Sequence, residues 1–284
     1  MFQTFFKERH VYKPCEIDVV LTRAFAATKY SKKAKCLYYN IPCAFDIETT
    51  SFYDADGNKT AVMYVWTLGL NGLIIIGRTW DEFVTVCERL EKVLGLNRKL
   101  RLIIGVHNLA FEFQFLRKLF NWEKVFAIKE RTPCYALTDG GIEFRCTYIL
   151  TGYSLETVAK NLTMFKIYKL GDFDYTQIRN TKTILFTHEI NYCINDVMIV
   201  MCLLYERILQ DGGIGKIPLT KTSYVREQCR EACFGDKKPE NRGKYNRQRQ
   251  KYSEFIRTLI ITSDEYKQAK RAFQGGYTHA NFFM

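Results

Sequence analysis

The stretch CAFDIETTS, residues 43–51, places two acids two residues apart directly after an apolar run. Apolar residues that lead into an alternating pattern indicate a β-strand, and side chains two apart in a strand project from the same face. Asp46 and Glu48 therefore project together, and their like charges repel unless a cation lies between them. Hard divalent cations such as Mg²⁺ prefer such oxygen ligands. The alternative for an isolated D-x-E pair is a solvated strand end.

Composition and charge narrow the class of protein. The chain has 284 residues, enough for one large domain or two small ones with a real core. Its 42 Lys and Arg against 30 Asp and Glu give a net charge of +12, which favours a polyanionic partner, nucleic acid before an anionic membrane. No apolar stretch is long enough to span a bilayer, and no signal peptide is expected. The ten Cys residues form no C-x-x-C pair and show no zinc spacing, which favours reduced thiols in the cytoplasm.

The apolar periodicity predicts an α/β fold in which helices flank a mixed sheet. An Asn-Gly pair at 71–72 is a strong hairpin signal between two of the strands. Strands are expected at 41–47, 61–70, 73–76 and 100–108, with short strand-like pieces at 135–137 and 142–148. Helices are expected at 81–94, 110–120 and 187–210, and behind a Ser154 cap.

Three regions follow from this pattern: a basic N-terminal extension at 1–40, a central domain at 41–211 and a basic linker segment at 212–284. Within the last, seven Lys or Arg lie between Lys237 and Lys251 against one Glu. This run is either a solvated linker or a segment that contacts phosphates, with Tyr245 and Tyr252 available to stack on bases.

Two further acids lie on helices that are predicted to flank the sheet. Glu112 lies four residues after Asn108, at the start of the helix that follows a buried strand. Asp196 lies four residues after Tyr192, so both share one face of a long helix. Each alone has an ordinary interpretation, as a first-turn acid or a surface acid. Asp196 is flanked by apolar residues, however, and a carboxylate on so apolar a helix needs a partner or a metal.

The three motifs D-x-E, N-x-x-x-E and Y-x-x-x-D, in this order, resemble those of DEDDy 3′–5′ exonucleases of the ribonuclease H-like fold. Further segments run in the order seen in protein-primed family B DNA polymerases of phages: FRCTYIL followed by SLETVAKNL, then KLGDFDY and AFQGGYTHAN. This resemblance covers residues 41–281 approximately. It implies the exonuclease domain of such a polymerase at 41–211 and the start of the polymerase domain at 212–284.

The resemblance also implies site residues, cofactors and partners. Two divalent cations, Mg²⁺ or Mn²⁺, would bind four acids while a Tyr orients the attacking water; these are Asp46, Glu48, Glu112, Asp196 and Tyr192. The residues that would contact DNA are Thr49, Asn108, Phe111, Thr147, Tyr148, Lys169, Phe273, Gly275 and Gly276. The implied role is proofreading during viral DNA replication in the host cytoplasm. The implied partners are a single-stranded 3′ end, primer-template DNA, a terminal protein primer and a separate polypeptide carrying the palm, but no membrane.

The sequence departs from the family pattern at three points. Glu112 replaces the usual Asp, and Lys169 lies one residue early, with Leu170 in the expected place. The carboxylate motifs of the palm do not occur, so a truncated copy or a polymerase split across two genes is expected, without nucleotide addition by this chain alone. Two alternatives stay open: a free-standing DEDDy exonuclease acting on DNA or RNA, and a non-catalytic DNA-binding or polymerase-docking module.

Overall fold

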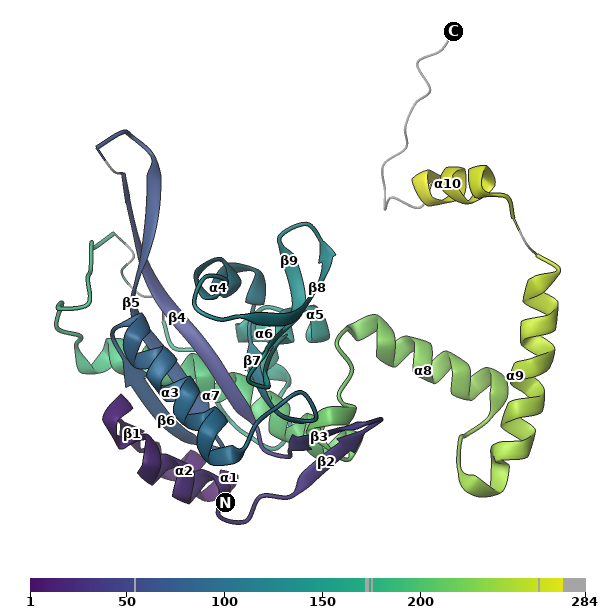
Figure 1. Ribbon diagram of the computed structural model, residues 1–284, viewed down its shortest axis with the longest axis horizontal. Coiled ribbons are helices and arrows are strands. Elements are labelled where there is room, and N and C mark those ends of the chain that lie inside the picture. Colours follow the sequence, from purple (N-terminus) through teal and green to yellow (C-terminus); the bar gives the residue numbers. More distant parts are fainter. Residues whose placement is uncertain (54, 172–173, 175, 260, 273–284) are drawn as a thin grey trace, which may run out of the picture. The chain divides into compact units, whose positions relative to one another are not determined.

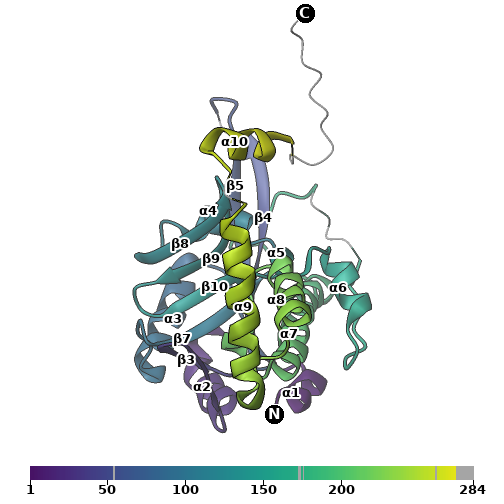
Figure 2. The same ribbon diagram turned by 90° about the vertical axis from the view of Figure 1, so that its right-hand side faces the viewer.

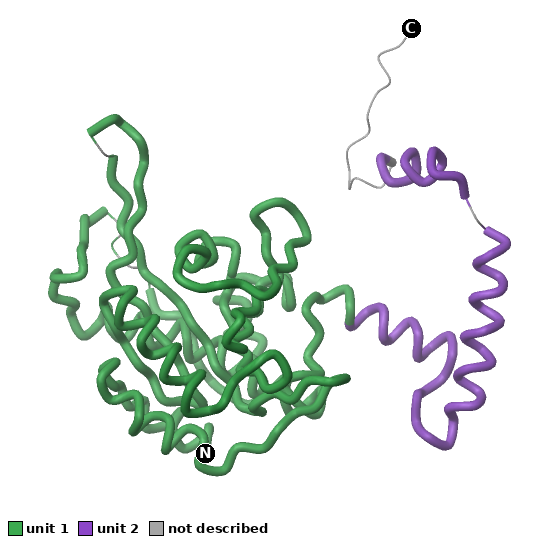
Figure 3. The backbone as a smooth tube through the Cα atoms, viewed as in Figure 1, with its two compact units in different colours: residues 1–223 green, residues 224–284 purple. Residues whose placement is uncertain are grey.

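The computed structural model describes residues 1–53, 55–171, 174, 176–259 and 261–272 (Figure 1). The chain divides into two compact units, residues 1–223 and residues 224–284 (Figure 3).

Unit 1 is built on a mixed sheet whose central strands have the order β6-β5-β4-β7-β10. Among these five strands only β5, the second of them in sequence, is antiparallel to the other four. This is the ribonuclease H-like arrangement, so the expected fold class is confirmed. The bounds are β4 (Cys43–Tyr53), β5 (Lys59–Leu70), β6 (Leu73–Gly77), β7 (Leu100–Val106) and β10 (Ile142–Cys146).

The turn between β5 and β6 shows how closely the sequence fixes local structure. Asn71 and Gly72 both have positive φ, 52° and 95°. A two-residue hairpin needs this conformation at both positions, which Asn and Gly adopt most readily. The predicted hairpin is therefore confirmed, with Leu70 paired to Leu73.

Strand β4 is longer than expected. The sequence predicted a strand that ends at residue 47, whereas β4 continues to Tyr53 beside β5, with a bulge between Glu48 and Thr49. The two acids of the D-x-E pair thus lie in the middle of a strand that is paired on both sides near its start, and not at a solvated strand end.

Further strands extend the sheet at both edges. On one side β1 pairs with β6, and on the other β9 and β8 continue from β10. A small hairpin, β2 with β3, attaches to the start of β7. Strand β8 was not predicted, because nearly all its side chains are exposed and its sequence has no buried face. The bounds are β1 (Val11–Tyr12), β2 (Tyr30–Lys33), β3 (Cys36–Tyr39), β8 (Trp122–Lys129) and β9 (Thr132–Thr138).

Helices cover both faces of the sheet (Figure 2). On one face α3 (Trp80–Leu94) packs Phe83 against Phe45 of β4, with ring centroids 4.5 Å apart. A Thr79–Glu82 capping box starts this helix, and Gly95 ends it with a positive φ. On the other face lies α7 (Thr187–Asp211), a long helix whose middle is buried nearly all round.

Two glycines let α7 approach the sheet closely. A Cβ at Gly69 of β5 would lie 2.5 Å from the Met201 side chain, and one at Gly105 of β7 would lie 2.8 Å from Leu204. Without side chains at these two positions, the backbones of the sheet and helix can come together. The close approach matters because β4 and α7 carry the acids of the candidate site.

Shorter helices complete unit 1. The helix predicted behind the Ser154 cap is present, with the Ser154 hydroxyl accepting a hydrogen bond from the Thr157 amide. The bounds are α1 (Phe2–Glu8), η1 (Pro14–Glu16), α2 (Ile17–Phe25), α4 (Leu109–Leu116), α5 (Thr147–Thr151), α6 (Leu155–Asn161) and η2 (Ile214–Lys216).

The first 40 residues differ from the basic extension expected from the sequence. Phe2, Phe5, Val20 and Leu21 are buried, and β1 and β3 pair with strands of the sheet. The segment therefore belongs to unit 1, and its Lys and Arg residues decorate an amphipathic surface. The division between the units, at residue 223, also falls later than the boundary expected at 211.

Unit 2 is helical over its described residues. It holds most of α8 (Lys221–Phe234), then η3 (Pro239–Asn241), α9 (Arg242–Arg257) and α10 (Ser263–Ala272). The basic run expected as a linker thus forms most of α9. Tyr245 is buried against Phe234, with ring centroids 5.7 Å apart, so it is not available to stack on bases as the sequence suggested.

Among the described helices of either unit, none combines the length and the apolar composition that crossing a bilayer requires.

Candidate metal centre

The centre of the sheet brings together three of the predicted acids. Asp46 and Glu48 come from β4 and Asp196 comes from α7. One carboxylate oxygen of each lies within 4.8 Å of the others, a grouping that could hold a metal ion. Glu48 and Asp196 are buried, while Asp46 is partly exposed.

The alternation of β4 explains this placement. Phe45 and Ile47 point into the core on the α3 side, so Asp46 and Glu48, which alternate with them, point toward α7. On β5, Asp46 is opposite Thr67 and Glu48 is opposite Val65, which holds the pair in register. The acids are therefore fixed by strand pairing and not by a loop.

Glu112 approaches the same cluster from the first turn of α4. It is buried, and its Oε2 has no hydrogen-bond partner among the described residues. Burial, together with the charges of Asp46 and Glu48, raises the pKa of Glu112 well above its usual range. Glu112 is not one of the three acids whose oxygens lie within 4.8 Å of one another, but the charges of Asp46 and Glu48 still act on it.

Lys169 contacts the cluster despite its displaced position in the sequence. Its Nζ donates to both carboxylate oxygens of Asp196, at 2.7 and 2.9 Å, and to the Tyr192 hydroxyl at 2.8 Å. The long Lys side chain bridges the one-residue offset. The sequence left the role of Lys169 in doubt, and the structure places it on the acid and the Tyr predicted for the site.

The electrostatics reflect crowded carboxylates with limited compensation. Burial and the neighbouring Asp196 raise the pKa of Asp46 to about 7, an effect that Lys169 partly offsets. Burial likewise raises the pKa of Asp196, against the hydrogen bonds from Lys169 and Tyr192. Each acid is thus held where losing its proton is unfavourable without added positive charge.

A partly buried His that sequence reasoning missed lies directly after β7. Nδ1 of His107 is 3.1 Å from Oγ1 of Thr147, and that hydroxyl donates to the carbonyl of Val106. Burial and the charge of Lys169 lower the pKa of His107 to about 4, so its imidazole is neutral at pH 7. The HN pair after a buried strand was the available signal.

Besides Lys169, the eight residues predicted to contact DNA fall into three groups. Phe111 and Tyr148 are exposed, Asn108 is exposed at the start of α4 with a positive φ of 74°, and Thr49 is partly exposed at the β4 bulge. Thr147 is buried, and its hydroxyl lies against His107. Three others lie outside the described residues: Phe273, Gly275 and Gly276.

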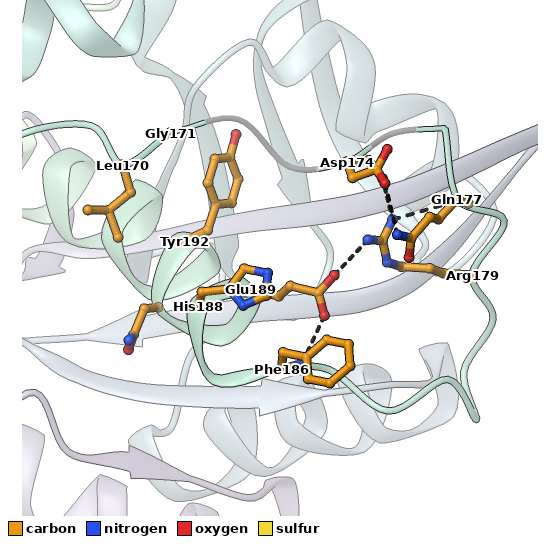
Figure 4. A pocket seen from close by; sticks show the side chains of 10 residues that line it. Leu170, Gly171, Asp174, Gln177, Arg179, Phe186, His188, Glu189 and Tyr192 are labelled. Carbon is orange, nitrogen blue, oxygen red and sulfur yellow. Dashed lines mark hydrogen bonds and ion pairs between the residues drawn. The ribbon is translucent and has the colours of Figure 1, made fainter.

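Beside Tyr192 opens a cavity of about 430 Å³ that the sequence did not suggest (Figure 4). A buried ion pair supports its wall: Nη2 of Arg179 lies 2.6 Å from Oε1 of Glu189. The Arg179 amide also donates to Oγ1 of Thr50. Through its ion pair with Glu189 and its hydrogen bond to Thr50, Arg179 joins the segment before α7 to both α7 and β4.

The donor set suits a hard divalent cation. Every candidate ligand is a carboxylate oxygen, as Mg²⁺ and Mn²⁺ prefer. The unpartnered buried Oε2 of Glu112 is the kind of atom that a bound ion would satisfy. Asp46, Glu48, Asp196 and Glu112 therefore fit a metal centre, with Lys169 supplying part of the positive charge.

Fold and site together define an α/β chain with a ribonuclease H-like sheet that carries a buried cluster of acids. Neither a scan against protein-family models nor a search of curated proteins finds a match.

Among solved structures, the chain is similar to Phi29 DNA polymerase complexed with primer-template DNA and incoming nucleotide. The match has 18% identity and a TM-score of 0.48, over 64% of this chain and 32% of that one. Phi29 DNA polymerase complexed with single-stranded DNA matches with 17% identity and a TM-score of 0.46, over 61% of this chain and 32% of that one. The catalytic core of RRP6 from Trypanosoma brucei matches with 10% identity and a TM-score of 0.40, over 73% of this chain and 50% of that one. The match thus spans about a third of the length of the Phi29 polymerase chain.

Proposed function

We propose that this chain is a metal-dependent 3′–5′ exonuclease that hydrolyses the last phosphodiester bond at the 3′ end of single-stranded DNA. The observation that supports this most strongly is the convergence of Asp46, Glu48 and Asp196 within 4.8 Å, with Glu112 beside them. So many buried carboxylates at one point need cations, and hydrolysis of a phosphodiester is chemistry that such cations assist.

The four carboxylates would hold two divalent cations, Mg²⁺ or Mn²⁺. When bound, such ions supply a water nucleophile at neutral pH and stabilise charge on the phosphate oxygens. The Tyr192 hydroxyl accepts a hydrogen bond from Lys169 and lies against Asp196, so it is fixed beside the acids, where it would orient a water. An ordinary Tyr stays protonated near pH 7, so the role of this hydroxyl is positioning and not general base catalysis.

The other residues around the cluster would orient the strand. Lys169 holds Asp196 and Tyr192 in one arrangement through its three contacts. Phe111 and Tyr148 present exposed aromatic faces, and base stacking on such faces tolerates any sequence. The neutral imidazole of His107 adds no positive charge to a site that already contains Lys169.

A non-catalytic docking module is the weaker proposal. Two carboxylates 4.8 Å apart repel by about 3.5 kcal/mol at an effective dielectric constant of 20. Removing the charge of Asp46 would relieve this repulsion and leave the Lys169–Asp196 pair intact. A docking role uses none of these charges, so the crowding of Asp46, Glu48 and Asp196 supports a site that binds cations.

The experiment is digestion of a single-stranded oligodeoxynucleotide labelled at its 5′ end, with Mg²⁺, with Mn²⁺ or with EDTA. The proposal predicts a ladder that shortens from the 3′ end, needs a divalent ion and disappears when Asp46→Asn and Glu48→Gln are combined. The matched control, Asp81→Asn with Glu88→Gln, changes the same groups at exposed positions of α3 and should digest like the parent. Digestion that survives in the cluster variant sinks the proposal.

Proofreading within a DNA polymerase is the finer form of the proposal, and it rests on the sequence motifs. A polymerase context predicts that a matched RNA strand is digested more slowly than DNA. It also predicts faster removal of a mismatched 3′ nucleotide than of a paired one, because a frayed end reaches the site more readily. Equal rates on RNA and DNA would favour a free-standing exonuclease instead.

A further inference from the structure

Unit 2 carries a disproportionate share of the positive charge. Over residues 224–284 the sequence has 13 Lys and Arg against 7 Asp and Glu, a net +6 in 61 residues. The whole chain of 284 residues has +12, so about a fifth of the length carries half of the excess. The acids of the metal centre lie in unit 1, so this charge is a separate feature.

The charge borders a cavity of about 460 Å³ formed by α8 and α9 and the turn between them. We call this cavity the basic notch and define it by six of its lining residues: Arg230, Phe234, Lys237, Arg242, Tyr245 and Arg249. The rings of Phe234 and Tyr245 pack edge to face and are buried, so they give the notch a rigid apolar base. Four cationic side chains surround that base.

The cations of the notch are not equally neutralised. Glu227 pairs with Lys237 and, at 3.7 Å, with Arg230. For Arg242 and Arg249 no ion pair occurs among the described residues. These two lie seven residues apart on α9, two helical turns and about 10.5 Å along the axis. Their charges lie on the same side of the helix, and the described part of the chain gives neither a carboxylate partner.

We propose that the basic notch binds the phosphodiester backbone of a single-stranded nucleic acid. Arginine guanidinium groups donate paired hydrogen bonds that match phosphate oxygens, and Arg supplies three of the four cations here. A spacing of about 10.5 Å reaches phosphates on non-adjacent nucleotides of one strand. Tyr252, half exposed and packed edge-on against Phe234, offers a ring near the base of the notch.

An anionic membrane fits this surface less well. A helix that lies on a membrane presents a continuous apolar face opposite its charges. Along 242–251 of α9 the one apolar side chain is Tyr245, and it is buried against Phe234. The opposite side of this stretch carries Lys244 and Lys251, both exposed. A helix charged on both sides of its buried contact favours a narrow polyanion over a flat apolar surface.

The inference deepens the proposed exonuclease function, on which its biological sense rests, by giving the digested strand a second contact away from the acids. Its test does not depend on catalysis. Fluorescence anisotropy of a labelled oligothymidylate is measured with the full chain in EDTA, over a series of salt concentrations. Arg242→Gln with Arg249→Gln removes the two unpaired charges of the notch.

The helix itself supplies the control. Lys244→Gln with Lys251→Gln removes the same charge at the same spacing from the opposite side of α9. Loss of two phosphate contacts should flatten the slope of log affinity against log salt by about 1.4 and weaken binding about 25-fold at 0.1 M salt. The Lys variant should keep the parent slope. Circular dichroism checks that both variants keep the parent helix content.

Each outcome decides the matter. Equal losses in the Arg and Lys variants would show diffuse attraction to α9 and overturn the notch, as would no loss in either. Tighter binding to phosphatidylserine vesicles than to the oligonucleotide, lost in the Arg variant, would overturn it in favour of lipid. Notch-dependent binding by a chain that digests nothing would sustain the inference and refute the proposed function.

Discussion

Replacing Asp46 with Asn should stabilise the metal-free protein and weaken its stabilisation by divalent ions. The substitution keeps the volume of the side chain and removes one charge from a group of three carboxylates within 4.8 Å. At that distance one pair repels by about 3.5 kcal/mol at an effective dielectric constant of 20. Asp46 has two such neighbours, but Lys169 offsets part of the repulsion. We expect a gain in the free energy of unfolding on the order of 3 kcal/mol above pH 7.

The gain should depend on pH with a definite sign. The pKa of Asp46 is raised to about 7 in the folded chain, from 3.8 without the protein environment. Between these values the folded state holds a proton that the unfolded state has lost, so the parent loses stability as pH rises through this window. The Asn variant has no such group. Its advantage should therefore grow from pH 4 to pH 7 and then stay constant.

The assay is urea unfolding followed by circular dichroism, in EDTA and again in Mn²⁺ or Mg²⁺. Ions that bind the folded state stabilise the parent by about 2.7 kcal/mol at 100 times the dissociation constant. The variant should gain much less from metal. The difference in the free energy of unfolding between variant and parent should therefore shrink or change sign when metal is added. The exposed control Asp81→Asn should follow the parent throughout. A variant less stable than the parent in EDTA at pH 8 would refute the reasoning.

Three further substitutions probe the surroundings of the cluster. Glu112→Asp should keep or raise the turnover number on single-stranded DNA, because it restores the shorter arm of the related motif; a large loss would show a pocket built for Glu. Lys169→Met should lower kcat by about tenfold to a hundredfold and change KM little, as loss of a charge-assisted contact implies; an unchanged kcat would remove Lys169 from the site. Glu189→Gln breaks the buried pair with Arg179 and should cost about 3–5 kcal/mol in urea unfolding; a cost below about 1 kcal/mol would mean that this pair does not support the cavity wall.

Local rules predicted those parts of the fold that local chemistry controls. The hairpin at Asn71 and Gly72, the capped helix that ends at Gly95 and the long helix that ends at Gly212 all depend on residues close in sequence. The same is true of the D-x-E geometry, because alternation in a strand needs no long-range information. That Asp196 would lie close to Asp46 was predicted from the family motifs and not from periodicity.

Other features depend on distant contacts and could not be predicted. The first 40 residues are amphipathic rather than merely basic, and their role appears once Phe2 and Val20 find partners in the fold. Strand β8 is exposed on both faces, so hydrogen bonds to β9 define it and no apolar pattern does. Tyr245 looked available for stacking because its partner Phe234 is eleven residues away, across a turn. The reach of Lys169 depends on side-chain length, which motif alignment ignores.

Binding of Mn²⁺ to the purified chain, followed by electron paramagnetic resonance of the free ion, tests the central claim most directly. The proposal predicts saturable binding of about two ions per chain, with at least one lost in Glu48→Gln. A control variant, Glu91→Gln, alters a carboxylate that bonds to Thr138 away from the cluster and should bind like the parent. Absence of saturable binding, or equal binding by the Glu48 variant and the parent, would contradict a metal centre at Asp46, Glu48 and Asp196.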